Sequence, residues 1–167
     1  MADISSDSSA SGGAGIDLSQ FYQVFFEEAG DNLTAMERLL LGLETGNADD
    51  ETLNAIFRCA HSIKGGAATF GFSDLAELTH VMETLLDRLR RHELAPTPPM
   101  VDTLLASGDA LREMLADRAR IQQVVTDTAD ISAELAGRIV VKVSFKEQML
   151  QAREEAIIRT VNQLLAE

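Results

Sequence analysis

Hydrophobic residues recur at intervals of three and four along most of the chain, a spacing typical of amphipathic helices. The pattern predicts four helices, over about residues 17–46, 50–68, 73–92 and 98–120. The apolar positions of these segments are mainly Leu, Ala, Ile and Met, which suit packing of helix on helix. Because the connections are short, we expect an all-α fold, an up-down-up-down four-helix bundle.

Polar and turn-forming residues mark where these helices begin and end. Residues 69–72 (TFGF) predict the turn between the second and third helices, and Gly46 with Asn47 predicts the end of the first. The predicted N-terminal caps are Asp17 (in a capping box with Gln20), Asp49 or Asp50, Ser73, and Thr97, which precedes Pro98 at the first helical position.

The pattern changes at both ends of the chain. Residues 1–16 are rich in Ser, Gly and Ala without an apolar period, which predicts a flexible tail. A short fifth helix is expected over 127–136, a strand over 139–145, where apolar and polar residues alternate, and a helix over 147–166. We therefore interpret 17–137 as the helical bundle. The β-α stub over 138–167 is then the start of a following domain or a linker.

Composition narrows the class of protein. The net charge of −13 argues against binding to nucleic acid or to an anionic membrane surface. No apolar stretch approaches the roughly 20 residues of a membrane span, so we expect no membrane insertion and a cytoplasmic location. A single cysteine, Cys59, leaves no intrachain disulfide and no cysteine-based zinc site.

The run AHSIKGGA at residues 60–67 carries the most distinctive chemistry. His61 falls on the flank of the apolar stripe and is predicted to be solvent-accessible, with Lys64 one turn later. On a neighbouring antiparallel helix, Glu83 can face His61 across the groove, and His80 lies one turn from Glu83. A carboxylate that accepts one imidazole N–H leaves the other nitrogen as a nucleophile, and Lys64 can pair with phosphoryl oxygens. This set predicts phosphoryl acceptance.

Two other interpretations of these residues stay open. Gly65 and Gly66 would leave room for a partner's active site to reach His61, or they could permit close packing between helices. A metal site built from His61, His80 and Glu83 is disfavoured, because the inner faces of the bundle carry Leu, Ala and Met where di-metal bundles carry carboxylates. We therefore expect no metal.

Residues 54–67 (NAIFRCAHSIKGGA) and the following TFGF turn closely resemble the N-terminal histidine phosphotransfer (HPt) domain of the bacterial chemotaxis kinases of the CheA type. The segments FFEEA at 25–29 and LTHVMETLLD at 78–87 fit the same family, so the resemblance covers roughly 17–120. The segment 139–165 also looks like the start of the regulator-docking domain that follows in many of these kinases.

The resemblance implies roles for these residues. His61 would accept a phosphoryl group in trans from a CheA-type ATP-binding kinase domain, with Glu83 orienting its ring and Lys64 and His80 completing the network. The group would then pass to an aspartate on response-regulator receiver domains. The chain would act as part of a protein-histidine kinase without an ATP site, since no glycine-rich nucleotide motif is present and ATP is used by the parent kinase domain. The alternative is a non-catalytic helical interaction module in which His61 is incidental.

Overall fold

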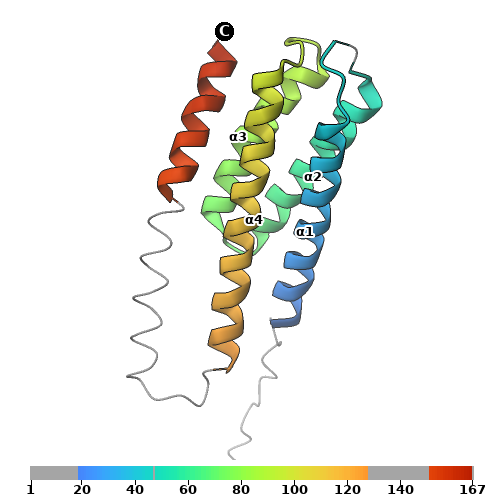
Figure 1. The fold of residues 1–167 in the computed structure, drawn as a ribbon. Helices are drawn as coiled ribbons and strands as arrows, with labels where there is room; N and C mark the ends of the chain where they lie inside the picture. The colour runs from blue at the N-terminus through green and yellow to red at the C-terminus, as the bar shows by residue number, and fades with distance from the viewer. Residues whose placement is uncertain (1–18, 47, 128–150, 167) are drawn as a thin grey trace, which may run out of the picture.

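The computed structural model describes residues 19–46, 48–127 and 151–166, and within these ranges the secondary structure is entirely helical. The helices are α1 (Ser19–Leu41), α2 (Asp50–Thr69), α3 (Ser73–Arg90), α4 (Pro98–Asp127) and one over residues 151–166. Successive helices run in opposite directions (Figure 1), with α2 packed against α1 and α3, and α4 closing the bundle against α1 and α3. The predicted up-down-up-down bundle is confirmed.

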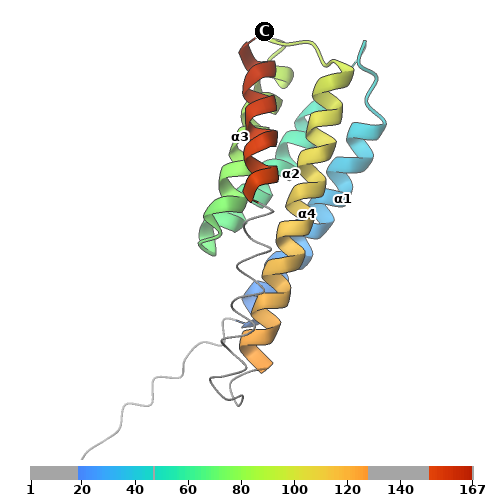
Figure 2. The ribbon, with the colours of Figure 1, turned by 60° about the vertical axis from the view of Figure 1, so that its left-hand side comes forward.

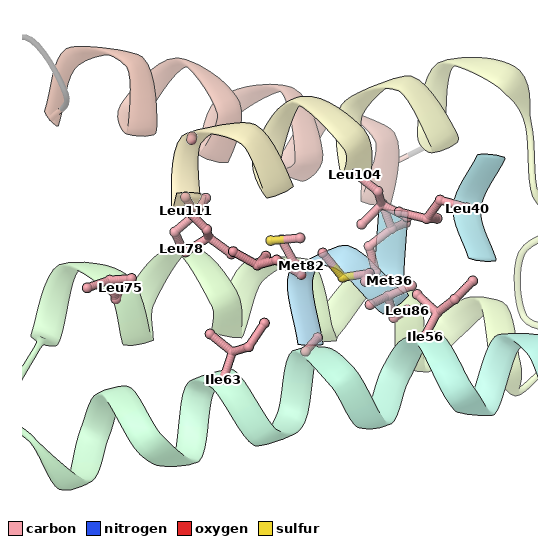
Figure 3. Close-up of a cluster of buried hydrophobic side chains, with 14 of the residues drawn as sticks. Met36, Leu40, Ile56, Ile63, Leu75, Leu78, Met82, Leu86, Leu104 and Leu111 are labelled. Atoms are coloured by element: carbon pink, nitrogen blue, oxygen red, sulfur yellow. The ribbon is translucent and has the colours of Figure 1, made fainter. Parts of the chain in front are cut away.

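The core follows the predicted hydrophobic spacing. Side chains from all four helices point into the space between them, among them Met36, Ile56, Met82 and Leu104 (Figure 3). On α2 the buried positions are spaced by three and four residues, and they are Leu53, Ile56, Ala60, Ile63 and Ala67. Because this face is filled, the next residue after Ala60 turns toward solvent on the α3 side, which positions His61.

Local chemistry explains two helix starts and one turn. Asp49 is the N-cap of α2, and its carboxylate accepts from the Thr52 N–H at 2.8 Å, which resolves the choice between Asp49 and Asp50. Pro98 begins α4 as predicted. Gly71, in the turn between α2 and α3, has φ +75°, a left-handed conformation that favours glycine.

Three predicted boundaries are wrong. The first helix ends at Leu41, because Gly42 weakens the helix and the Leu43 N–H bonds to Leu40 in a tighter final turn. Phe72, not Ser73, precedes α3, and no side chain caps that helix. The fourth helix continues past residue 120 to Asp127, since no glycine or proline lies between these positions.

Phe72 takes the cap position because it belongs to an aromatic cluster that joins the start of α1 to the α2–α3 turn. Ring centroids within the cluster lie 5.1–6.4 Å apart, and its members are Tyr22, Phe25, Phe26, Phe70 and Phe72. Contacts at these distances add to the burial of apolar area. The cluster therefore sets how α1 lies against α2 near the functional site.

The helix over residues 151–166 lies along α3 and α4 (Figure 2). Ile157 and Val161 join the hydrophobic core, and Arg153 pairs with Glu113 of α4 at 2.6 Å. The predicted strand over 139–145 lies outside the described residues, as does nearly all of the predicted helix over 127–136. None of the described helices is both long and apolar enough to cross a membrane.

Glu154 is the unusual residue of this helix, because only 6% of its surface is exposed. Burial, together with the carboxylates of Asp74, Glu77 and Glu155, raises the pKa of Glu154 to about 7. Between the ordinary value and about 7, the unfolded chain releases a proton that the folded protein keeps. The free energy of unfolding therefore falls as pH rises through this range.

Replacing Glu154 with Gln removes the loss of stability that comes from ionising this buried carboxylate at higher pH. We expect Glu154→Gln to raise the free energy of unfolding by about 1–3 kcal/mol at pH 8 and to change it little at pH 4. Urea unfolding of both proteins at the two pH values measures the difference. The matched control is Glu28→Gln on the exposed side of α1. A stabilisation that is equal at both pH values would contradict the assignment.

Candidate functional site

His61 lies on the surface of α2 and faces Glu83 of α3. The side chain of His61 is 63% exposed, whereas that of Glu83 is only 9% exposed. The imidazole Nδ1 is 2.5 Å from Glu83 Oε1. This contact joins the two helices at the point where the sequence predicted that they meet.

Lys64, one turn after His61 on α2, donates from Nζ to the other carboxylate oxygen of Glu83. His80 is more distant, with its Nδ1 3.9 Å from Glu83 Oε2 and a side chain that is 68% exposed. The structure thus brings His61, Lys64 and Glu83 into direct contact. His80 lies at the edge of the group, beyond hydrogen-bonding distance.

The charge state of Glu83 reflects two opposing effects. Burial acts to raise the pKa of Glu83, but the hydrogen bonds from Lys64 and His61 and the positive charge of Lys64 outweigh it and leave the pKa lowered. The carboxylate therefore stays ionised at neutral pH. Its stabilising contribution is fully present above the ordinary carboxyl pKa and is lost as pH falls through the lowered value.

An ionised Glu83 selects one form of the neutral imidazole. Since a carboxylate can only accept, Nδ1 carries the proton and donates it to Oε1. The lone pair then resides on Nε2, at the opposite side of an exposed ring. The arrangement can present Nε2 as a nucleophile, with Lys64 as a nearby cation.

Phe57 and Arg90 contribute to the site, and the sequence analysis did not identify either as a site residue. The Phe57 ring stacks on the His61 ring at 5.9 Å with 17° between their planes. The Arg90 guanidinium lies 3.8 Å from the centre of the Phe57 ring, at cation–π distance. The spacing of Phe57 four residues before His61 could have indicated the stacking. Arg90 depends on how α3 ends beside α2, which no local pattern reveals.

The two glycines of the site have different surroundings. A Cβ at Gly65 would meet nothing within 4 Å, so the surface beside His61 is open at this point. A Cβ at Gly66 would lie 2.6 Å from two ring carbons of Phe25. Of the two interpretations left open above, close helix packing accounts for Gly66, and open space toward a partner fits Gly65.

Neither a reactive cysteine nor a metal site is found beside His61 among the described residues. Cys59 is half-buried beside the core, and burial raises the pKa of its thiol, which disfavours the reactive thiolate. Within the described residues, no group of three or more His, Cys, Asp or Glu side chains is arranged to hold a metal ion.

The fold and this geometry define a helical domain that presents one oriented, accessible histidine. The chain belongs to the Hpt domain family, which matches residues 20–131. Among its relatives, the chemotaxis protein CheA of Klebsiella aerogenes is 48% identical over 115 residues, covering 69% of this chain and 18% of that protein. CheA of Salmonella typhimurium is 51% identical over 100 residues, covering 60% and 15%. The chain thus spans less than a fifth of the length of these relatives.

Solved structures agree with the family. The CheA phosphotransferase domain from Thermotoga maritima has a TM-score of 0.56 and 35% identity, covering 59% of this chain and 93% of that one. The phosphorylated P1 domain of CheA3 in complex with CheY6 from R. sphaeroides has a TM-score of 0.63 at 22% identity, covering 89% and 97%. At 22% identity, the similarity to the CheA3 domain supports the fold alone. The predicted resemblance is confirmed.

The glycine pair gives a matched test of packing. We expect Gly66→Ala to lower the free energy of unfolding by about 1–3 kcal/mol, because the new methyl group must displace the packed Phe25 ring. Gly65→Ala has open space and should raise it by about 0.5–1 kcal/mol through helix propensity. Urea unfolding of both variants measures these changes, and equal effects would show that the Phe25 contact does not constrain Gly66.

Proposed function

We propose that this chain is the phosphoryl-accepting domain of a chemotaxis kinase of the CheA type. The observation that carries the proposal is the exposed His61 ring with Nδ1 held by an ionised, buried Glu83. Membership of the Hpt family and the similarity to chemotaxis proteins support it. The partners are an ATP-binding kinase domain and response-regulator receiver domains, and use of ATP implies a cytoplasmic reaction.

In the accepting step, His61 Nε2 attacks the γ-phosphorus of ATP held by the kinase domain. The N–P bond forms as the bond from phosphorus to the bridging oxygen breaks, and ADP leaves. Positive charge develops on the imidazole, and the Glu83 carboxylate beside Nδ1 stabilises it. Lys64, already oriented toward Glu83, adds a cation near the incoming phosphoryl oxygens.

In the donating step, a carboxylate oxygen of a receiver aspartate attacks the same phosphorus. The P–N bond breaks and its electron pair returns to Nε2, which restores the neutral imidazole with its Nδ1 proton on the Glu83 side. The open surface over Gly65 supports the approach of both partners, because each must bring its reacting group to the same exposed nitrogen.

Labelling with radioactive ATP and a CheA-type kinase domain that lacks its own phosphotransfer domain tests the proposal. We expect acid-labile, base-stable label on the chain and none on His61→Gln, which should stay folded because an exposed side chain contributes little to the core. His92→Gln is the matched control, since His92 pairs with Asp50 outside the site. Absence of label on the wild-type chain would favour a helical interaction module instead.

If Glu83 orients His61, its removal should slow phosphoryl acceptance without abolishing it. Glu83→Ala should slow phosphoryl acceptance by about 10²-fold, the low end for assistance of this kind, because the nucleophile remains while the support at Nδ1 is lost. Nitrogen NMR of the His61 ring should also show a weaker preference for the proton on Nδ1. Glu28→Ala is the control, and an unchanged rate in Glu83→Ala would contradict this role.

A further inference from the structure

A cleft of about 490 Å³ opens between α3, α4 and the helix over residues 151–166. Figure 2 shows how that helix lies along α3 and α4. None of the lining residues comes from α2, which carries His61 and Lys64. The cleft is therefore separate from the phosphotransfer site.

The lining of the cleft is strongly acidic. Its one lining cation among the described residues, Arg118, donates to Asp74 at 2.7 Å. The carboxylates that line the cleft come from all three helices, and they are Asp74, Glu77, Asp117, Glu154 and Glu155. Like charges this close repel one another, so the cleft favours a positively charged occupant.

Glu154 provides a second, independent observation. Only 6% of this residue is exposed, and it lines the cleft. No described residue forms a hydrogen bond or ion pair with its carboxylate, whose oxygens are not fully enclosed. Buried polar groups in folded proteins are nearly always hydrogen-bonded, because an unmet carboxylate is costly. A donor from a bound cation would satisfy this group.

The arrangement of the lining favours an organic cation over a metal ion. Carboxylates that bind a metal converge on a single point at 2.0–2.6 Å, and no such group exists within the described residues. Here the carboxylates share the lining of the cleft with the apolar side chains of Met114, Ile121 and Ile158. Ammonium groups joined by methylenes match a lining that holds both carboxylates and apolar side chains.

We propose that the cleft binds a small aliphatic diamine or polyamine, with one ammonium group donating to Glu154 and the methylenes lying against Met114, Ile121 and Ile158. The further ammonium group pairs with the carboxylates that α3 contributes. Binding would also hold the helix over residues 151–166 against the bundle, because the ligand contacts both.

Binding of this kind must be linked to the proton on Glu154. A cation favours the carboxylate form, and the pKa of Glu154 near 7 means that binding at neutral pH releases part of a proton. The affinity therefore rises with pH. The carboxylates that act on Glu154 are Asp74 and Glu77 of α3 and Glu155 beside it, and Asp117 and Arg118 of α4 share the lining of the cleft.

Isothermal titration of the 167-residue chain with 1,5-diaminopentane tests the proposal, since both amines of this probe resemble lysine and stay ionised at pH 8. We expect saturable binding that is about tenfold tighter at pH 8 than at pH 6. The heat of binding at pH 7 should depend on the ionisation enthalpy of the buffer, because a proton is released.

Matched variants separate this site from general attraction to an acidic protein. Glu154→Gln should weaken binding by about tenfold or more while the fold becomes more stable, and Glu28→Gln should bind as the wild type does. His61→Gln should also bind normally, so the result is independent of the proposed phosphotransfer. Non-saturable binding, equal weakening in Glu28→Gln, unchanged binding in Glu154→Gln, or equally tight binding of Mg²⁺ would each overturn the proposal.

Discussion

The Glu83 carboxylate, buried between α2 and α3, is the group on which the geometry of the site depends. One of its oxygens faces His61 Nδ1 and the other accepts from Lys64, so two residues a turn apart on α2 converge on one side chain of α3. A buried carboxylate that lost these partners would be costly. The packing of α3 against α2 and the orientation of the imidazole therefore stabilise each other.

The imidazole is supported on one edge and one face. Glu83 holds the Nδ1 edge, the Phe57 ring stacks against its plane, and Arg90 lies over Phe57 from the end of α3. The Nε2 edge remains at the surface, beside the open space over Gly65. Such a site suits a reaction whose other groups arrive with a partner, because no further catalytic residue needs to come from this chain.

The helical bundle could be predicted from spacing alone, because each helix buries a stripe such as Leu53, Ile56 and Ala60 that repeats every three or four residues. The pairing of His61 with Glu83 followed from the same spacing and from the order of the helices. Two helix boundaries could not be predicted in this way. A tightened last turn ends α1 at Leu41, and contacts within the aromatic cluster place Phe72 before the start of α3. The contact of Arg90 with Phe57 also depends on tertiary structure.

Glu83 and Glu154 show how position decides what a carboxylate does. Both are buried, yet Glu83 faces Lys64 and His61 and its pKa is lowered, while Glu154 faces other carboxylates and its pKa is raised. In the composition, both residues count equally toward the net charge of −13. Only the fold makes their pKa values differ. Near neutral pH, Glu83 is a fixed charge that orients the site, whereas Glu154 can lose or gain a proton as its surroundings change.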